Sequence, residues 1–138
     1  MTDSIFTKII NREIPAEVVY EDDLVIAFLD INPVNKGHLL VVPKQWFKNI
    51  FDGEAKILAQ IMRVGQKLGL AIKKSLGADG VNLLMNNGEA AGQEEPHAHL
   101  HVIPRYEGDN SYQKPAHKEY EDGEMEVTAT KIKTALAD

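Results

Sequence analysis

An apolar stripe with helical spacing runs through the middle of the chain and limits the folds open to it. Six aliphatic residues recur every three or four positions, namely Ile57, Ile61, Val64, Leu68, Ile72 and Leu76. Asp52 is the expected N-cap and Gly77 the expected C-terminal stop of this helix. The stripe is typical of a helix that packs one face on a core.

Shorter apolar and β-branched segments flank this helix and predict strands. We expect them at residues 17–20, 24–30, 38–42, 81–86 and 97–103, with a short helix at 6–12. Strands grouped around one main helix favour an α+β fold with an antiparallel five-stranded sheet. The 138 residues fit a single domain, 1–138, with a C-terminal extension from 107 in which 127–136 is a possible helix.

The segment from His97 to Arg105 concentrates three of the five histidines of the chain. On a strand, alternate side chains share a face, so His97, His99 and His101 converge while Ala98 and Leu100 face the other way. Such a cluster suits acid–base or nucleophilic catalysis. Two other interpretations are a metal site and histidines that merely cover a half-buried sheet.

Two further segments carry polar groups that fit a ligand site. The stretch from Asn86 to Gln93 is rich in glycine and asparagine, which allows backbone N–H groups to approach an anion closely. His38 begins the strand that ends at Pro43, and Asp30 follows an apolar strand. Each is open to a plainer interpretation, since His38 could be a surface residue and Asp30 could only initiate a turn.

Composition excludes several classes of protein. The formal net charge of −6 argues against nucleic acid as the main partner. The chain shows no window of about 20 apolar residues, so we expect no membrane span. With no cysteine and no basic-then-apolar N-terminal segment, a cytoplasmic location is expected.

These motifs together closely resemble the histidine triad (HIT) family of nucleotide hydrolases and transferases, in its bacterial type, over about residues 4–106. The residues that carry the resemblance are Ile5-Phe6, Phe28 to Ile31, Gly37 to Lys44, Asn86, Gly92-Gln93 and the alternating His97, His99 and His101. The resemblance implies the family's α+β fold and a homodimer that requires no cofactor.

The resemblance also implies a role for each site residue. His99 would attack the α-phosphorus of a purine nucleotide derivative, and His101 and Gln93 would bind the phosphoryl oxygens. His97 and His38 would orient the triad. Asn86 would face the phosphate and Asp30 would hold the ribose. The base would lie among Phe6, Ile9, Phe28 and Ile31.

Two departures from the family qualify this expectation. Many bacterial relatives bind zinc through a Cys-x-x-Cys pair, a later histidine and the first triad histidine, whereas this chain has Ser4, Thr7 and Trp46 at the first three positions. We therefore expect no metal. Glu94 and Glu95 precede the triad and leave the leaving-group end of the reaction open. The alternative function is a weakly active nucleotide-binding regulatory module that acts through a protein partner.

Overall fold

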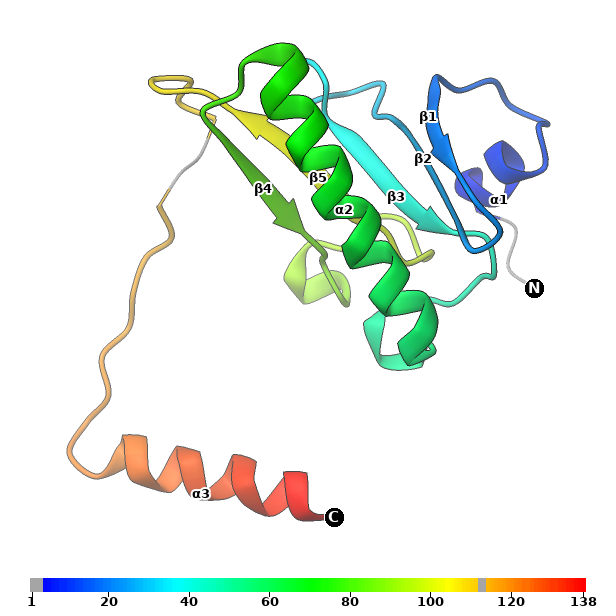
Figure 1. The fold of residues 1–138 in the computed structure, drawn as a ribbon. Coiled ribbons are helices and arrows are strands. Elements are labelled where there is room, and N and C mark those ends of the chain that lie inside the picture. Colours follow the sequence, from blue (N-terminus) through cyan, green and yellow to red (C-terminus); the bar gives the residue numbers. More distant parts are fainter. Residues whose placement is uncertain (1–3, 112–113) are drawn as a thin grey trace.

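The computed structural model describes residues 4–111 and 114–138 and contains one antiparallel sheet (Figure 1). Its strands are β1 (Val18–Glu21), β2 (Val25–Leu29), β3 (Leu39–Pro43), β4 (Gly80–Leu84) and β5 (Leu100–Arg105), in the order β1-β2-β3-β5-β4. All four neighbouring pairs are antiparallel. The predicted α+β class and five-stranded sheet are confirmed.

The long helix α2 (Ala55–Leu76) covers one face of the sheet (Figure 1). Its predicted stripe is buried from Ile57 to Ile72, whereas Leu76 is 47% exposed. Gly77 ends the helix in the left-handed conformation, as predicted. The prediction of Asp52 as N-cap is wrong, because Asp52 closes the short 3₁₀ helix η1 (Ile50–Asp52) and Glu54 precedes α2.

The opposite face of the sheet carries a second apolar cluster, beneath the short helix α1 (Ile5–Ile10). Phe6 and Ile9 of α1 pack there against Phe28 of β2 and Leu40 of β3. Ser4 caps α1 by accepting a hydrogen bond from the Thr7 N–H at 3.0 Å. The sheet is thus apolar on both faces, and the histidines lie on the α1 side.

The triad strand is shorter than predicted. The ladder between β3 and β5 ends where Val41 pairs with Leu100, so His97 and His99 precede β5. The N–H of His97 bonds to the Glu95 carbonyl, and that of Ala98 bonds to the Phe47 carbonyl. The alternation survives nonetheless, since Ala98 and Leu100 belong to the core under α2.

The C-terminal segment stands apart from the sheet. From residue 114 it runs as an extended chain to α3 (Glu124–Ala137), which confirms the possible helix and begins before the predicted residue 127 (Figure 1). All its described side chains are exposed or half-buried. Over the described residues, no helix is long and apolar enough to cross a membrane.

Candidate functional site

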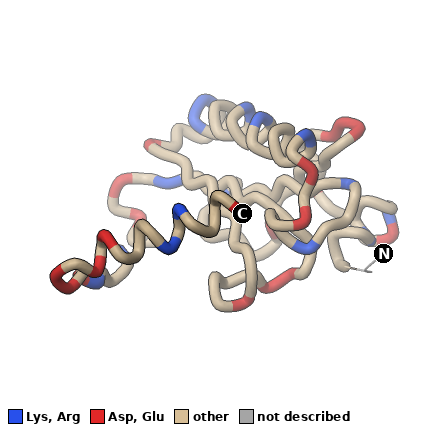
Figure 2. The backbone as a smooth tube through the Cα atoms, turned by 90° about the horizontal axis from the view of Figure 1, so that it is seen from below, with Lys and Arg blue, Asp and Glu red and all other residues tan. Residues whose placement is uncertain are grey.

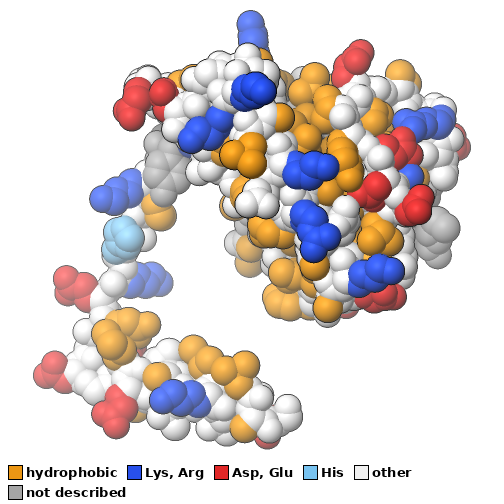
Figure 3. Space-filling view, viewed as in Figure 1, with side chains coloured by type: hydrophobic (Ala, Val, Ile, Leu, Met, Phe, Trp, Pro, Cys, Tyr) orange, Lys and Arg blue, Asp and Glu red, His pale blue; other side chains and the backbone are white. Residues whose placement is uncertain are grey.

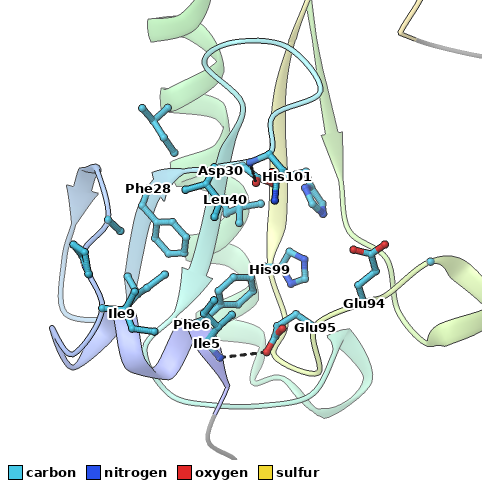
Figure 4. A pocket seen from close by; sticks show the side chains of 17 residues that line it. Ile5, Phe6, Ile9, Phe28, Asp30, Leu40, Glu94, Glu95, His99 and His101 are labelled. Atoms are coloured by element: carbon cyan, nitrogen blue, oxygen red, sulfur yellow. Dashed lines mark hydrogen bonds between the residues drawn. The ribbon is translucent and has the colours of Figure 1, made fainter.

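A cavity of about 320 Å³ opens on the α1 side of the sheet (Figure 4). Its apolar wall includes the four residues expected to form a base pocket, Phe6, Ile9, Phe28 and Ile31. Ile31 is 87% exposed, so it forms the rim rather than the floor. Asp30, His99 and His101 line the same space, which brings the expected ribose and catalytic residues together.

Hydrogen bonds determine which ring nitrogen of His99 carries the proton and which one keeps a free electron pair. Its Nδ1 lies 2.7 Å from the His97 carbonyl oxygen, which can only accept, so Nδ1 carries the proton. In the neutral ring, Nε2 is then unprotonated. The ring of Phe6 lies 5.0 Å from that of His99, edge to face, and restricts its rotation. His99 is therefore held as a nucleophile or base.

A relay of hydrogen bonds sets the opposite tautomer on His101. The Val34 N–H donates to His38 Nδ1 at 3.1 Å, so His38 carries its proton on Nε2. That group lies 2.9 Å from His101 Nδ1 and donates to it, which places the proton of His101 on Nε2. His101 thus donates a hydrogen bond where His99 offers an electron pair.

His97 lies behind the cavity and is fully buried. Its Nε2 donates to the Pro43 carbonyl at 3.0 Å, and its Nδ1 lies 2.8 Å from the Ser4 hydroxyl, which donates to it. Ser4 in turn holds the start of α1. His97 therefore fixes α1 to β3 and presents its own carbonyl to His99.

Burial keeps the triad neutral. Desolvation lowers the pKa of His99 and His97, against a partly opposing effect of backbone carbonyls and the carboxylate of Glu95. Desolvation and the nearby His99 and His38 lower the pKa of His101 to about 4. Burial also lowers the pKa of His38. The electron pair of His99 is therefore available at neutral pH.

Gln93 and Asn86 do not line this cavity. The amide of Gln93 is buried and donates to the carbonyls of Lys48 and Glu95, while its oxygen accepts from the Gly88 N–H. Asn86 packs on Gly92 and donates to its carbonyl at 3.4 Å. Both residues brace the loop before the triad rather than point at His99.

Sequence reasoning missed Ser4 as a partner of His97 and Glu95 as a wall of the cavity. Ser4 had a detectable signal, because serine directly before a helix is a preferred N-cap. Glu95 accepts a hydrogen bond from the Ile5 N–H at 3.3 Å, across 90 residues of sequence. No local pattern could have indicated that contact.

Ser4, Thr7, Trp46 and His97, where the resemblance implies a zinc site, do not fit a structural zinc ion. Ser4 and Thr7 are hydroxyls that bond to one another, both nitrogens of His97 are engaged, and Trp46 donates to the Pro96 carbonyl. A second set, Asp30, His38 and His101, places ligand atoms within 4.8 Å of one another. A cation there would have to displace the proton shared by His38 and His101.

We expect activity and stability to be independent of metal. Dialysis against EDTA should leave both the turnover number and the thermal midpoint unchanged, because Ser4, Thr7 and His97 are held by hydrogen bonds within the protein. Zinc analysis before and after dialysis is the control. A stoichiometric zinc whose removal unfolds the protein would contradict the expectation.

The fold and the cavity define an α+β protein in which β5 and the segment just before it present a histidine pair to an apolar pocket. Residues 11–108 match the family described as HIT domain. The chain belongs to the histidine triad family, as its motifs predict.

Relatives support this membership along most of the chain. An uncharacterised HIT-like protein of Methanocaldococcus jannaschii is 54% identical over 110 residues, 80% of this chain and 84% of that protein. Adenylylsulfatase HINT3 of Arabidopsis thaliana is 41% identical over 107 residues, 78% of this chain but 54% of that protein. A crystal structure from Streptococcus mutans UA159 has a TM-score of 0.92 at 36% identity, covering 99% of this chain and 87% of that one.

Proposed function

We propose that the protein is a nucleotidyl hydrolase or transferase that acts at the α-phosphate of purine nucleotide derivatives. The observation that carries this proposal is the pair of tautomers at the cavity, with an electron pair on His99 Nε2 and a proton on His101 Nε2. Substrates of this class are AMP phosphoramidates, adenylates and dinucleoside polyphosphates. The similarity to a protein named as an adenylylsulfatase supports an adenylyl substrate.

The geometry supports a two-step reaction through a covalent intermediate. His99 Nε2 attacks phosphorus and the leaving group departs, after which water releases the nucleotide from the histidine. His101 donates a hydrogen bond to a phosphoryl oxygen as negative charge develops there. His38 orients His101 by donating a hydrogen bond to its Nδ1, and His97 orients His99 because its carbonyl accepts a hydrogen bond from His99 Nδ1.

The apolar wall and Asp30 form the nucleoside end of the proposed site. Phe6 and Phe28, whose rings lie 5.7 Å apart, would contact the base. One oxygen of Asp30 holds the Asn32 N–H, and the other lies 3.8 Å from His38 Nε2, beside the cavity where ribose hydroxyls could bind. Because apolar contacts discriminate weakly, we expect purines to be favoured without absolute selectivity. Gln93 and Asn86 hold the loop that closes the phosphate end.

A rapid-quench experiment separates the enzyme from a weakly active regulatory module. With excess adenylyl substrate, an enzyme whose second step is slower releases about one equivalent of leaving group per site in a burst. A weakly active module gives no burst and only slow turnover. The regulatory alternative gains support if nucleotide binds tightly while the leaving group is released slowly and without a burst.

We also propose a cytoplasmic homodimer, with residues 107–138 as an extension of a single HIT domain. The strand β4 lies at an edge of the sheet and exposes Leu83 and Leu84 by 41% and 45%. On α2, Met62 and Leu70 are 53% and 64% exposed, and hydrophobic side chains are visible on this face (Figure 3). An open apolar edge favours pairing with a second copy.

The dimer is tested by placing a charge on α2. We expect the wild type to sediment as a dimer at micromolar concentration. Leu70→Lys should raise the dissociation constant of the dimer at least about tenfold, because a lysine buried in the dimer interface would lack a charged partner. Val19→Lys changes an exposed aliphatic residue on β1, at the far edge, and should not dissociate the dimer. A fully active wild-type monomer would contradict the proposal.

A further inference from the structure

A second cavity, of about 230 Å³, lies beside the first and shares one residue with it. Its lining comes from the segment after β3 and from the loop before the triad, namely Lys48, Asn49, Gly88, Glu89, Gln93, Glu94 and Pro96. Glu94 also lines the first cavity, so the two spaces meet at its side chain. In Figure 4, Phe6 and Glu94 lie on opposite sides of His99.

Fixed contacts hold the walls of the second cavity in place. Gln93 is 7% exposed and ties Gly88 to the Lys48 and Glu95 carbonyls with hydrogen bonds of 2.7–3.0 Å. Asn87 accepts from the Ile50 N–H and links the same loop to η1. Because the amide of Gln93 is used in this way, it offers no donor to an anion in this space.

The side chains around the two cavities favour a cation over an anion. Asp30, Glu89, Glu94 and Glu95 are lining residues, and Lys48 is the one lysine or arginine among the described residues that line either space. Several Lys and Arg positions lie on α2, which covers the other face of the sheet, and further ones lie elsewhere in the chain (Figure 2). A polyphosphate needs several positive partners, which this site does not supply.

We propose that the second cavity holds the leaving group and that Glu94, with Glu89, selects leaving groups that carry an ammonium. This inference rests on the proposed function. It divides the substrate class, because it favours adenylyl compounds of amine-bearing carboxylic acids or phenols and disfavours dinucleoside polyphosphates. Glu95 contributes less, since its carboxylate accepts from the Ile5 N–H.

The chemical step requires no proton donor for such substrates. His99 Nε2 forms a bond to phosphorus while the bond from phosphorus to the leaving oxygen breaks, and that oxygen keeps the electron pair as a carboxylate or phenolate. Water then forms a new bond to phosphorus, the bond to Nε2 breaks with its pair returning to His99, and the water proton passes to solvent. An ionised Glu94 attracts the ammonium without having to act as an acid.

Three matched esters of AMP test the selectivity. Each carries a para-substituted phenol as leaving group, namely 4-(2-aminoethyl)phenol, 4-propylphenol or 3-(4-hydroxyphenyl)propanoic acid, so the end of the arm is cationic, neutral or anionic. We expect kcat/KM to fall in that order, with about a fivefold step between the first two at low salt, because a solvated ion pair contributes only modestly. Added salt should reduce the ratio of kcat/KM between the cationic and neutral esters.

Three variants test whether Glu94 determines this selectivity. Glu94→Gln should remove most of the ratio between the cationic and neutral esters, and Glu94→Lys should invert it. Glu119→Gln removes the same charge from an exposed position outside both cavities and should preserve the ratio. Equal kcat/KM for the three esters, with a nucleotidyl-enzyme still formed, overturns this inference alone. No turnover and no adduct with any ester overturns the proposed function itself.

Discussion

Replacing His99 by alanine is expected to lower turnover of adenylyl substrates by at least about 10³-fold, because the variant lacks the nucleophile of the proposed reaction. Nucleotide affinity should stay within about tenfold of wild type, since the apolar wall and Asp30 are unchanged. Single-turnover kinetics and calorimetric titration with AMP measure the two quantities separately.

The matched control for this change is His117→Ala, because His117 is an exposed histidine that lines neither cavity. That variant should retain wild-type turnover and affinity. Comparable turnover in His99→Ala and wild type would show that His99 is not the nucleophile. Loss of both turnover and AMP binding would instead indicate that the ring of His99 mainly supports the pocket through its contact with Phe6.

Acidification from pH 7 to pH 4 is expected to destabilise the protein, and turnover is expected to fall as the pH passes through the lowered pKa of His99. Burial lowers the pKa of all four site histidines in the folded state, that of His101 to about 4. Between that value and pH 6.5 the unfolded chain binds more protons than the folded one, so the free energy of unfolding falls as pH falls. The loss attributable to His101 is on the order of a few kcal/mol.

Urea denaturation at a series of pH values measures this dependence. We expect stability to be greatest above pH 6.5 and to decline below it, with a shallower slope in His101→Asn. Turnover should persist below pH 6.5 and fall only as pH passes through the lowered pKa of His99, where the electron pair of Nε2 is protonated. A turnover profile with a midpoint at or above pH 6.5 would contradict this account.

The sequence predicts the helix and strand layers of the fold because its apolar residues recur at regular spacing. The apolar stripe of α2 and the glycine that ends this helix are both local signals. The strand limits were less accurate because they depend on partners distant in sequence. The alternating pattern predicts that His97 lies on the strand, whereas the N–H of its neighbour Ala98 bonds to the carbonyl of Phe47, outside the sheet.

In the functional site too, local features could be predicted from the sequence and contacts between distant residues could not. The alternation of histidines predicted that His99 and His101 would share a face, and the structure brings both to one cavity. Their tautomers could not be predicted, since they depend on Val34, His38 and the carbonyl of His97. The resemblance predicts Gln93 at the phosphate, whereas its amide donates to the carbonyl of Lys48, 45 residues away in the chain, and to that of the nearby Glu95.

The central claim, covalent transfer of the nucleotide to His99, is tested most directly by mass spectrometry of quenched enzyme. Wild-type protein mixed with excess AMP ester and quenched in alkaline denaturant should carry one adenylyl group per chain, and peptide mapping should place it on Nε2 of His99. The His99→Ala variant should carry none. Active wild-type enzyme without an adduct at any reaction time, or with the group on His101, would contradict the account.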